Sequence, residues 1–288
     1  MSTYLVTGGG GFIGSNLVEA LLARGQRVRV LDDFSTGRRE NLAEAAAWAA
    51  RGGGAFELLE GDIRDADACR RAVDGADYVL HLAAMPSVQR SVVDPVSSNA
   101  VNVAGTLNVL VAARDAKVKR VVFASSSSLY GESETLPKLE SMPSAPISPY
   151  GLQKLAGETY CGLFWRLYGL PTVALRYFNV FGPRQDPGSE YSAVIPKFIR
   201  AIKAGRVPTI FGDGEQTRDF SFIDNVVAAN LAACEAGETA FGLAFNIACG
   251  ERISLNDLVR ELGGFAGRPV TPAYAPARAG DIRHSLAG

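Results

Sequence analysis

Histidine is scarce in this chain of 288 residues, where only His81 and His284 occur. Two histidines exclude a metal site built from several histidines and argue against a histidine-based catalytic triad. The cysteines contain no CxxC pair, which excludes a zinc knuckle and a thioredoxin-like redox pair. We therefore predict no metal site, and we expect buried free thiols of a reducing compartment at Cys69, Cys161, Cys234 and Cys249.

An excess of charge of either sign is also missing, since 29 Lys and Arg residues balance 30 Asp and Glu residues. A net charge of −1 gives no basic footprint for nucleic acid or for an anionic membrane. No uninterrupted apolar run approaches the roughly 18 residues of a membrane span, and the first residues lack the basic and apolar regions of a signal peptide. We expect a cytoplasmic protein without nucleic-acid or membrane partners.

The first 180 residues, in contrast, show a regular alternation of short β-prone runs with helical patterns. Such alternation predicts βαβ units and a parallel sheet covered on both faces, an α/β fold. Beyond this region the loops become longer and richer in proline and glycine. The expected strands are 4–7, 27–31, 56–60, 78–81, 120–124 and 172–176, and the expected helices are 12–24, 42–50, 66–73, 95–117 and 150–168.

Glycine is abundant, with 31 residues, and a cluster lies in the segment TGGGGFIG (7–14) between an expected strand and an expected helix. Its spacing is Gly8-x-x-Gly11-x-x-Gly14. One glycine permits the tight turn, the next lets backbone N–H groups approach a pyrophosphate, and the third allows close helix–strand packing. A flexible turn needs the same residues, but the flanking strand and helix favour a dinucleotide-binding loop.

Asp32 follows the second expected strand and stands 18 residues after Gly14. An acidic residue at this place binds the ribose hydroxyls of adenosine in dinucleotide-binding folds. The alternative is that Asp32 and Asp33 only open a polar turn. A carboxylate here repels a 2′-phosphate, so we predict NAD rather than NADP, although Arg38 and Arg39 follow nearby.

Tyr150 and Lys154 begin an expected helix, and their spacing places them one turn apart on one face. A nearby ammonium group and a nicotinamide cation both lower the pKa of a tyrosine from about 10, which suits Tyr150 to act as a general base. Serines 125–128 follow the expected strand 120–124, at the sheet edge where ligands bind. Taken singly, these patterns also fit an ordinary helix and a polar loop.

Nine segments, in order along nearly the whole chain, resemble the extended short-chain dehydrogenase/reductase family, and within it the UDP-hexose 4-epimerases. The segments are TGGGGFIG (7–14), DDFSTG (32–37), GDIRD (61–65), HLAA (81–84), NVAGT (102–106), SSSSLYG (125–131), YGLQK (150–154), LRYFNVFGPRQDP (175–187) and GDGEQTRDFSFIDNV (212–226).

This resemblance implies a Rossmann-type doubly wound parallel sheet in residues 1–178, to which part of 217–248 returns. A smaller C-terminal α/β domain, mainly 179–288, would bind the substrate. The resemblance also implies tightly bound NAD. The cofactor-binding residues would be Gly8, Gly11, Phe12, Ile13, Gly14, Asp32, Asp33, Ser35, Gly37, Asp62, Ile63, Leu82, Ala83, Ala84, Asn102, Tyr150, Lys154 and Tyr177.

The resemblance further implies three catalytic residues. Tyr150 would be the acid/base, Lys154 would hold the nicotinamide ribose and tune Tyr150, and Ser126 would supply the catalytic hydroxyl. Surface or ion-pair roles are the alternative for the arginines, and Pro86 departs from the lysine of some epimerases. The substrate-binding residues would be Ser87, Ser126, Ser127, Tyr150, Asn179, Val194, Thr209, Phe211, Arg218, Arg278, Asp281 and Ser285.

Two features of the sequence narrow the expected reaction. Related 4,6-dehydratases carry an Asp-Glu pair directly after the catalytic hydroxyl, whereas this chain has Ser127 and Ser128, which favours epimerisation. A bulky tyrosine at the position of Ser285 excludes an N-acetyl group in the family, so Ser285 implies acceptance of UDP-GlcNAc and UDP-GalNAc beside UDP-Glc and UDP-Gal. The sequence ends soon after, at Gly288, and we expect either a truncated chain or a differently closed substrate domain.

We therefore predict an enzyme that epimerises UDP-hexoses at C4 with NAD, through a transient 4-keto intermediate. The alternatives are another nucleotide-sugar enzyme of the family, such as a UDP-glucuronate epimerase, a decarboxylase or a reductase, and a non-catalytic NAD-sensing protein. The stretches 95–117 and 150–168 resemble the helices of the family's dimer interface, so we expect a homodimer. Their apolar positions are equally compatible with an internal core.

Overall fold

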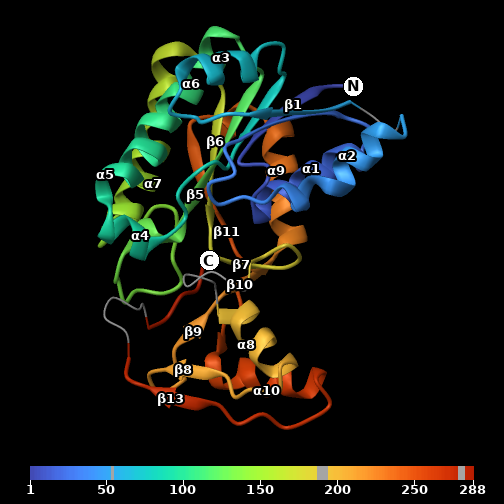
Figure 1. The fold of residues 1–288 in the computed structure, drawn as a ribbon. Helices are drawn as coiled ribbons and strands as arrows, with labels where there is room; N and C mark the ends of the chain where they lie inside the picture. The colour runs from blue at the N-terminus through green and yellow to red at the C-terminus, as the bar shows by residue number, and fades with distance from the viewer. Residues whose placement is uncertain (53–54, 187–193, 278–282) are drawn as a thin grey trace.

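The computed structural model describes residues 1–52, 55–186, 194–277 and 283–288, which form a larger and a smaller lobe (Figure 1). The larger lobe holds a parallel sheet of seven strands in the order β11-β6-β5-β4-β1-β2-β3. This is the strand order of a Rossmann fold, and the predicted fold class is confirmed. The strands are β1 (Thr3–Thr7), β2 (Arg27–Asp32), β3 (Phe56–Glu60), β4 (Tyr78–His81), β5 (Arg120–Ser126), β6 (Thr172–Tyr177) and β11 (Leu243–Ile247).

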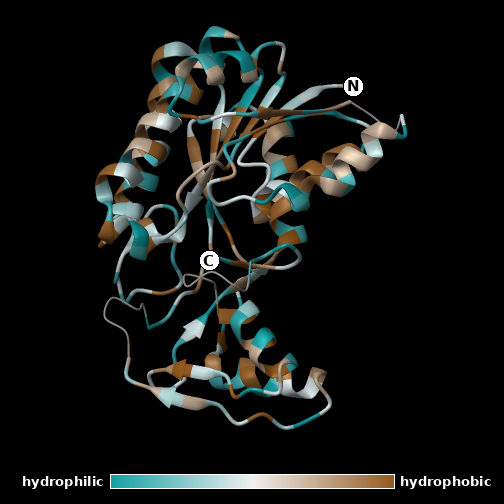
Figure 2. Cartoon of the chain, in the orientation of Figure 1, coloured by the Kyte–Doolittle hydropathy of each residue, from teal (hydrophilic) through white to brown (hydrophobic). Residues whose placement is uncertain are grey.

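Helices cover both faces of this sheet, so that apolar strands lie between amphipathic helices (Figure 2). One face carries α1 (Phe12–Ala23), α2 (Ala43–Ala50) and α9 (Ile223–Glu235). The other carries α3 (Ala66–Val73), α6 (Thr106–Asp115) and α7 (Pro149–Tyr168), with the short α4 (Val88–Val93) and α5 (Pro95–Asn99) beside α7. Every residue of β5 is buried, as expected for a strand covered on both sides.

The predicted strands and helices of the first 180 residues are present, with ends that differ by at most two residues outside the stretch 95–117. The expected helix 95–117 is built differently, because a π-helical segment, Ala100–Gly105, separates α5 from α6. The sequence pattern also missed α4, a helix of only six residues. Segment 217–248 contributes α9 and β11 to the larger lobe.

The smaller lobe packs two amphipathic helices, α8 (Val194–Lys203) and α10 (Leu255–Phe265), against short strands. Its buried core consists of Ile195, Phe198, Ile210, Leu255, Leu258 and Val259. The strand pairs are β8 (Thr209–Phe211) with β13 (Ala273–Ala275), β9 (Thr217–Arg218) with β12 (Ile253–Ser254), and β7 (Asn179–Phe181) with β10 (Phe220–Phe222).

The stretch Pro95–Asp115 is long and apolar enough to cross a membrane by length and composition alone. Helices in the core of water-soluble proteins meet the same criterion. Here 44% of the most apolar window is buried, and the stretch packs against α3 and α7. Part of its apolar surface is exposed, and this surface is where the sequence predicts the interface of a homodimer.

The cysteines correct one expectation. Cys69, Cys161 and Cys234 are buried free thiols, but Cys249 is exposed. Cys249 lies after β11 and directly before Gly250, outside the helix and sheet layers. Composition alone could not show that this thiol is exposed. Within the described ranges, no cluster of three or more His, Cys, Asp or Glu side chains is arranged to hold a metal ion.

Candidate active site

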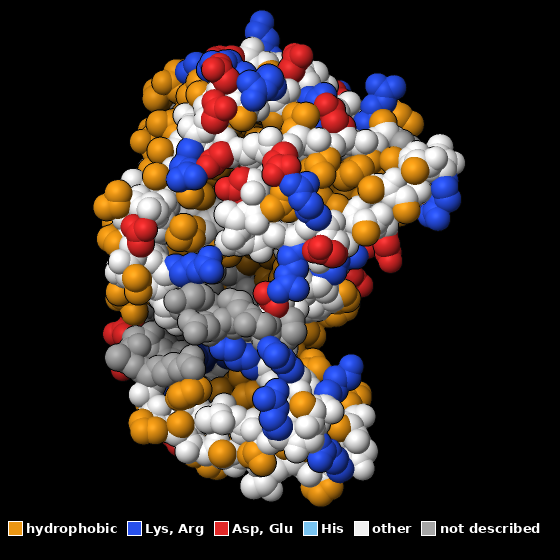
Figure 3. Space-filling view, viewed as in Figure 1, with side chains coloured by type: hydrophobic (Ala, Val, Ile, Leu, Met, Phe, Trp, Pro, Cys, Tyr) orange, Lys and Arg blue, Asp and Glu red, His pale blue; other side chains and the backbone are white. Residues whose placement is uncertain are grey.

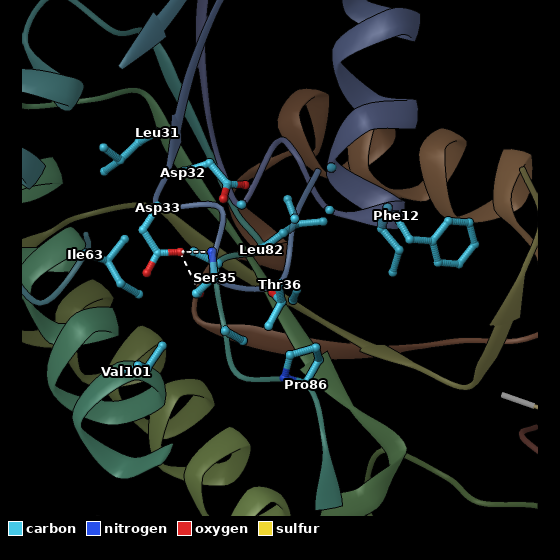
Figure 4. A pocket seen from close by; sticks show the side chains of 18 of the residues that line it. Phe12, Leu31, Asp32, Asp33, Ser35, Thr36, Ile63, Leu82, Pro86 and Val101 are labelled. Atoms are coloured by element: carbon cyan, nitrogen blue, oxygen red, sulfur yellow. Dashed lines mark hydrogen bonds between the residues drawn. The ribbon is translucent and has the colours of Figure 1, made fainter. Parts of the chain in front are cut away.

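A pocket opens at the carboxyl ends of the strands in the larger lobe, where parallel sheets bind their ligands (Figure 4). The glycine loop, the turns after β2 and β4, the end of β5 and the start of α7 form its walls. It is lined by Gly8, Gly11, Phe12, Ile13, Gly14, Leu31, Asp32, Asp33, Ser35, Thr36, Gly37, Gly61, Asp62, Ile63, Leu82, Ala83, Ala84, Pro86, Val101, Ala124, Ser125, Tyr150, Lys154 and Tyr177.

The glycine loop forms a cradle that side chains would fill. Gly8 has a φ of +72°, and a Cβ on Gly14 would lie 2.2 Å from the Gly8 carbonyl oxygen. Gly11 is the N-cap of α1, and no side chain of the described chain caps this helix end. Backbone N–H groups and the positive end of the helix dipole are therefore available to a diphosphate.

Gly14→Ala should abolish cofactor binding, because its Cβ would collide with the Gly8 carbonyl and force the loop open. The measurement is the NAD content of the purified protein together with its melting temperature. Gly264→Ala is the control, since a Cβ there meets no atom within 4 Å and lies in α10. We expect this control to keep NAD and to gain up to about 1 kcal/mol of stability. Normal NAD content in Gly14→Ala would refute the role of the cradle.

Asp32 lies at the end of β2, and its carboxylate accepts hydrogen bonds from the backbone N–H groups of Gly10 and Phe34, both at 2.8 Å. Burial raises the pKa of Asp32, while these two hydrogen bonds lower it in part. Each carboxylate oxygen keeps lone-pair capacity for a ribose hydroxyl. The exposed Asp33 instead holds its own turn, accepting from the backbone N–H and the hydroxyl of Ser35 (Figure 4).

The two arginines that follow the second strand have carboxylate partners. Arg38 pairs with Asp186 at 2.8 Å. Arg39 pairs with Glu60, and its guanidinium lies 4.3 Å from the centre of the Phe34 ring. Both cations are thus engaged by protein groups, and the nearby Asp32 would repel a 2′-phosphate. This arrangement favours NAD over NADP.

The first turn of α7 brings Tyr150 and Lys154 to the pocket. Ser148 caps the helix by accepting from the Gly151 N–H at 3.1 Å, and Pro149 occupies the first helical position. The Tyr150 N–H donates to Ser91 Oγ of α4 at 3.0 Å. The start of the helix is therefore fixed from two sides.

The Lys154 ammonium points back under the end of β5. Its Nζ donates to the Ala124 carbonyl at 2.7 Å and lies 5.0 Å from the centre of the Phe123 ring. The distance from Nζ to the centre of the Tyr150 ring is 5.8 Å. Burial lowers the pKa of Lys154 to about 8, so the side chain carries its positive charge at neutral pH.

The expected direction of the Tyr150 pKa shift is wrong for the protein chain alone. Burial raises the pKa of Tyr150 to about 12, and the hydrogen bond with Ser126 lowers it only in part. Desolvation of the phenolate is the larger of these two effects. Ser126, for its part, donates to Ser128 Oγ at 3.1 Å and accepts from the Ser128 N–H at 3.2 Å.

Asn102 does not line the pocket. Its side chain is buried behind the wall, accepting from the Met85 N–H at 2.7 Å and donating to Gln153 Oε1 at 2.8 Å. Tyr177 lines the pocket but donates its hydroxyl to Asn230 Oδ1 at 3.0 Å. Ser87 caps α4 by accepting from the Arg90 N–H.

Sequence reasoning missed part of the pocket wall. Val101 lines it in place of Asn102, one position earlier in the π-helical segment. Leu31, Thr36 and Gly61 adjoin predicted site residues, which was the available signal, and Ala124 lies within β5. Pro86 and Ser125, which the sequence had already placed at the site, also line the pocket.

A second pocket lies in the smaller lobe and includes β7, β8 and α8. Basic side chains gather near the hollow between the lobes (Figure 3), and three cationic residues, Lys197, Arg206 and Arg218, line this pocket. Five predicted substrate residues are among its lining: Asn179, Val194, Thr209, Phe211 and Arg218.

The remaining predicted substrate residues are placed as follows. Ser285 Oγ accepts from Asn179 Nδ2 at 3.0 Å, which links the C-terminal segment to the second pocket. Ser127 lies in the 3₁₀ turn after β5, next to Ser126. Arg278 and Asp281 lie outside the described residues.

The sequence model of the NAD dependent epimerase/dehydratase family matches residues 4–248. The chain belongs to this family. It is an enzyme of the family, and the predicted cofactor NAD is confirmed.

Individual relatives match almost the whole chain. It is 44% identical over 283 residues to the UDP-glucose 4-epimerase of Mycolicibacterium smegmatis, covering 98% of this chain and 88% of the relative. A UDP-N-acetylglucosamine 4-epimerase from Methanobrevibacter ruminantium, solved with UDP-N-acetylmuramic acid, has a TM-score of 0.93 at 40% identity and covers 100% and 89% of the two chains. The UDP-glucose 4-epimerase of Thermus thermophilus, solved with NAD, has a TM-score of 0.87 at 36% identity and covers 99% and 90%.

Proposed function

We propose that this protein interconverts UDP-hexoses by epimerisation at C4, with NAD as a cofactor that is regenerated in each turnover. One observation carries the proposal. Tyr150, Lys154 and the Ser126 hydroxyl lie together where the dinucleotide pocket meets the end of β5. Ser127 and Ser128 stand where a dehydratase would need an acid and a base, so the chain is equipped for proton and hydride transfer at one carbon only.

NAD supplies the hydride acceptor and donor when bound, and its nicotinamide cation adds positive charge near the tyrosine. The glycine cradle would hold its diphosphate and Asp32 its adenosine ribose. Tyr150 takes the proton from the sugar 4-hydroxyl, directly or through Ser126, and returns it after the ring has turned over. Charge from Lys154 favours the phenolate against the burial that raises the pKa of Tyr150.

Retention of the 4-keto sugar is the task of the second pocket. Asn179 and the cations Lys197, Arg206 and Arg218 line it, which suits a nucleoside diphosphate. Remote binding of the UDP group lets the sugar rotate while the intermediate stays bound. We propose residues 179–288, apart from α9 and β11, as the substrate domain and residues 1–178 as the NAD domain.

Arg218→Met should weaken UDP binding by about ten- to a hundredfold, because a hydrogen bond to an ionised group contributes about 1.5–3 kcal/mol. The Arg218 side chain is held in place by the carbonyls of Thr217 at 2.9 Å and Arg283 at 3.2 Å. Isothermal titration with UDP measures the effect. Arg260→Met is the control, since Arg260 pairs with Asp257 on the surface of α10. Equal UDP affinity of both variants would contradict the placement of the diphosphate.

The experiment that tests the function uses the purified protein without added NAD. Each of UDP-Glc, UDP-Gal, UDP-GlcNAc and UDP-GalNAc is incubated with it, and the products are identified by NMR. We expect C4 epimers and no net rise in NADH absorbance. Ser285 supports acceptance of the N-acetylated pair. A decarboxylated, reduced or dehydrated product would assign the chain to another activity of the family.

We further propose a cytoplasmic homodimer. Several apolar side chains on α4, α5 and α7 are exposed on one face of the larger lobe, among them Val92, Val93, Val96 and Leu152. Exposed apolar surface of this kind marks a protein interface. The predicted helices 95–117 and 150–168 contribute Val96 and Leu152 to it.

Val96→Asp should convert the dimer to a monomer, because a carboxylate would be buried in the interface without a partner. Val96 is 79% exposed in the single chain, so the substitution leaves the fold of one subunit intact. Light scattering on a gel-filtration column measures the mass. Phe265→Asp is the control, since Phe265 is 88% exposed on the other lobe. A monomeric starting protein, or an unchanged mass of Val96→Asp, would refute this interface.

A further inference from the structure

His81 is a buried titratable side chain that the proposed chemistry does not use. It ends β4, directly before the pocket-lining residues 82–84, and is 1% exposed. Its Nδ1 lies 2.7 Å from Thr7 Oγ1, and its Nε2 lies 3.0 Å from Thr106 Oγ1. One hydroxyl therefore stands at each nitrogen of the ring.

The neighbouring groups fix the tautomer of this ring. The Thr106 hydroxyl donates its single proton to the Asn102 carbonyl at 2.7 Å, so it must accept from His81 Nε2–H. At Nδ1 the neutral ring accepts from the Thr7 hydroxyl, which itself accepts from the Ala83 N–H at 3.2 Å. Four hydrogen bonds thus run in one direction from Ala83 to Asn102.

Neutrality of the ring agrees with its surroundings. Burial and the positive charge of Lys154 lower the pKa of His81 to about 3. The Phe123 ring centre lies 5.7 Å from the His81 ring centre and 5.0 Å from Lys154 Nζ. A second cation at this place would be both desolvated and close to the first.

Both ends of this hydrogen-bond chain hold the wall of the cofactor pocket. Thr7 binds the backbone of Ala83, and the Asn102 side chain binds the backbone of Met85 two residues further on. Asn102 also donates to Gln153, the residue before Lys154 in α7. This series of hydrogen bonds therefore connects the loop after β4 with α7, the helix that carries Tyr150 and Lys154.

We propose that His81, as its neutral Nε2–H tautomer, is a positioning residue that sets the distance between the cofactor wall at 82–86 and the catalytic side chains of α7. This inference rests on the proposed function, because transfer of a hydride depends steeply on the placement of its donor and acceptor. A displacement of the wall would slow the chemical step and would leave the distant UDP pocket unchanged.

Two substitutions at Thr106 separate positioning from packing. Thr106→Val keeps the shape but removes the hydroxyl, and Thr106→Ser keeps the hydroxyl but removes a methyl group. Thr106 is buried, so both variants lose thermal stability. We expect kcat to fall about tenfold or more in the valine variant, with KM within about twofold, and we expect kcat of the serine variant to stay within about twofold of the parent.

Two further readouts do not depend on which sugar reacts. The release of NAD from Thr106→Val should be at least about fivefold faster than from the parent and from Thr106→Ser. Nitrogen-15 NMR of histidine-labelled protein reports the tautomer, and His284→Gln leaves a single histidine for assignment. We expect an unprotonated Nδ1 and a protonated Nε2 at pH 7.

An imidazolium or an Nδ1–H tautomer in the parent protein would overturn the proposal, even if the valine variant fails to fold. Equal losses of kcat and of NAD retention in both Thr106 variants would overturn it as well, because packing alone would then explain them. Absence of turnover with every UDP-hexose would refute the proposed function, while the NMR and NAD-release measurements would still decide the role of His81.

Discussion

Replacing Tyr150 with phenylalanine should lower kcat by about 10³-fold or more while NAD stays bound. The substitution removes one oxygen atom, which exchanges the proton of the sugar 4-hydroxyl, and general acid–base catalysis is worth about 10²–10⁴-fold. Backbone hydrogen bonding of Tyr150 to Ser91 and the capping of α7 by Ser148 do not involve that oxygen. Turnover is measured with the UDP-hexose identified by product analysis.

The NAD content of Tyr150→Phe and its affinity for UDP should match those of the parent protein, which would show that the variant still binds cofactor and substrate. Ser127→Ala is a matched substitution in the loop after β5, and its kcat should fall far less. Turnover of Tyr150→Phe within tenfold of the parent rate would refute Tyr150 as the acid/base.

Loss of the Lys154 charge should have the next largest effect, with kcat of Lys154→Met about 10²–10³-fold lower at pH 7. The ammonium lies 5.8 Å from the centre of the Tyr150 ring and favours the phenolate. Without it, the phenolate of Tyr150 loses a nearby positive charge and forms less readily in a buried site that already raises the pKa of this side chain. A smaller fraction of the enzyme then carries the base at neutral pH.

The pH profile of kcat distinguishes this electrostatic role from a packing role. Because burial lowers the pKa of Lys154 to about 8 and raises that of Tyr150, loss of the ammonium charge above that pH offsets the growing ionisation of Tyr150, and the activity of the parent protein should level off. In Lys154→Met no such charge exists, so activity should keep rising with pH as Tyr150 ionises. A profile of the variant that runs parallel to the parent profile would contradict the electrostatic role.

The sheet and the glycine loop could be predicted because their signals are local. Apolar runs such as β5, buried at every position, mark strands covered on both faces, and three spaced glycines between a strand and a helix mark the diphosphate cradle. The acidic Asp32 at the end of β2 was predictable for the same reason, since strand ends of a parallel sheet meet at one edge.

Two errors show where local patterns fail. The segment Ala100–Gly105 is π-helical, and within it Val101 lines the pocket while Asn102 lies behind the wall, bound to Gln153. The direction of the Tyr150 pKa shift depends on how many atoms from other elements surround the phenol. The π-helical turn cannot be seen in the local pattern of residues 95–117, and the burial of the phenol cannot be seen in the spacing of Tyr150 and Lys154.

The most direct test of the account uses a UDP-hexose with deuterium at C4, incubated with the protein without added NAD. Hydride removal and return at the same carbon predict a C4-epimeric product that keeps its deuterium in ordinary water. Replacement of the label by hydrogen from the solvent would contradict hydride transfer at C4, and with it the central role of the site formed by Ser126, Tyr150 and Lys154.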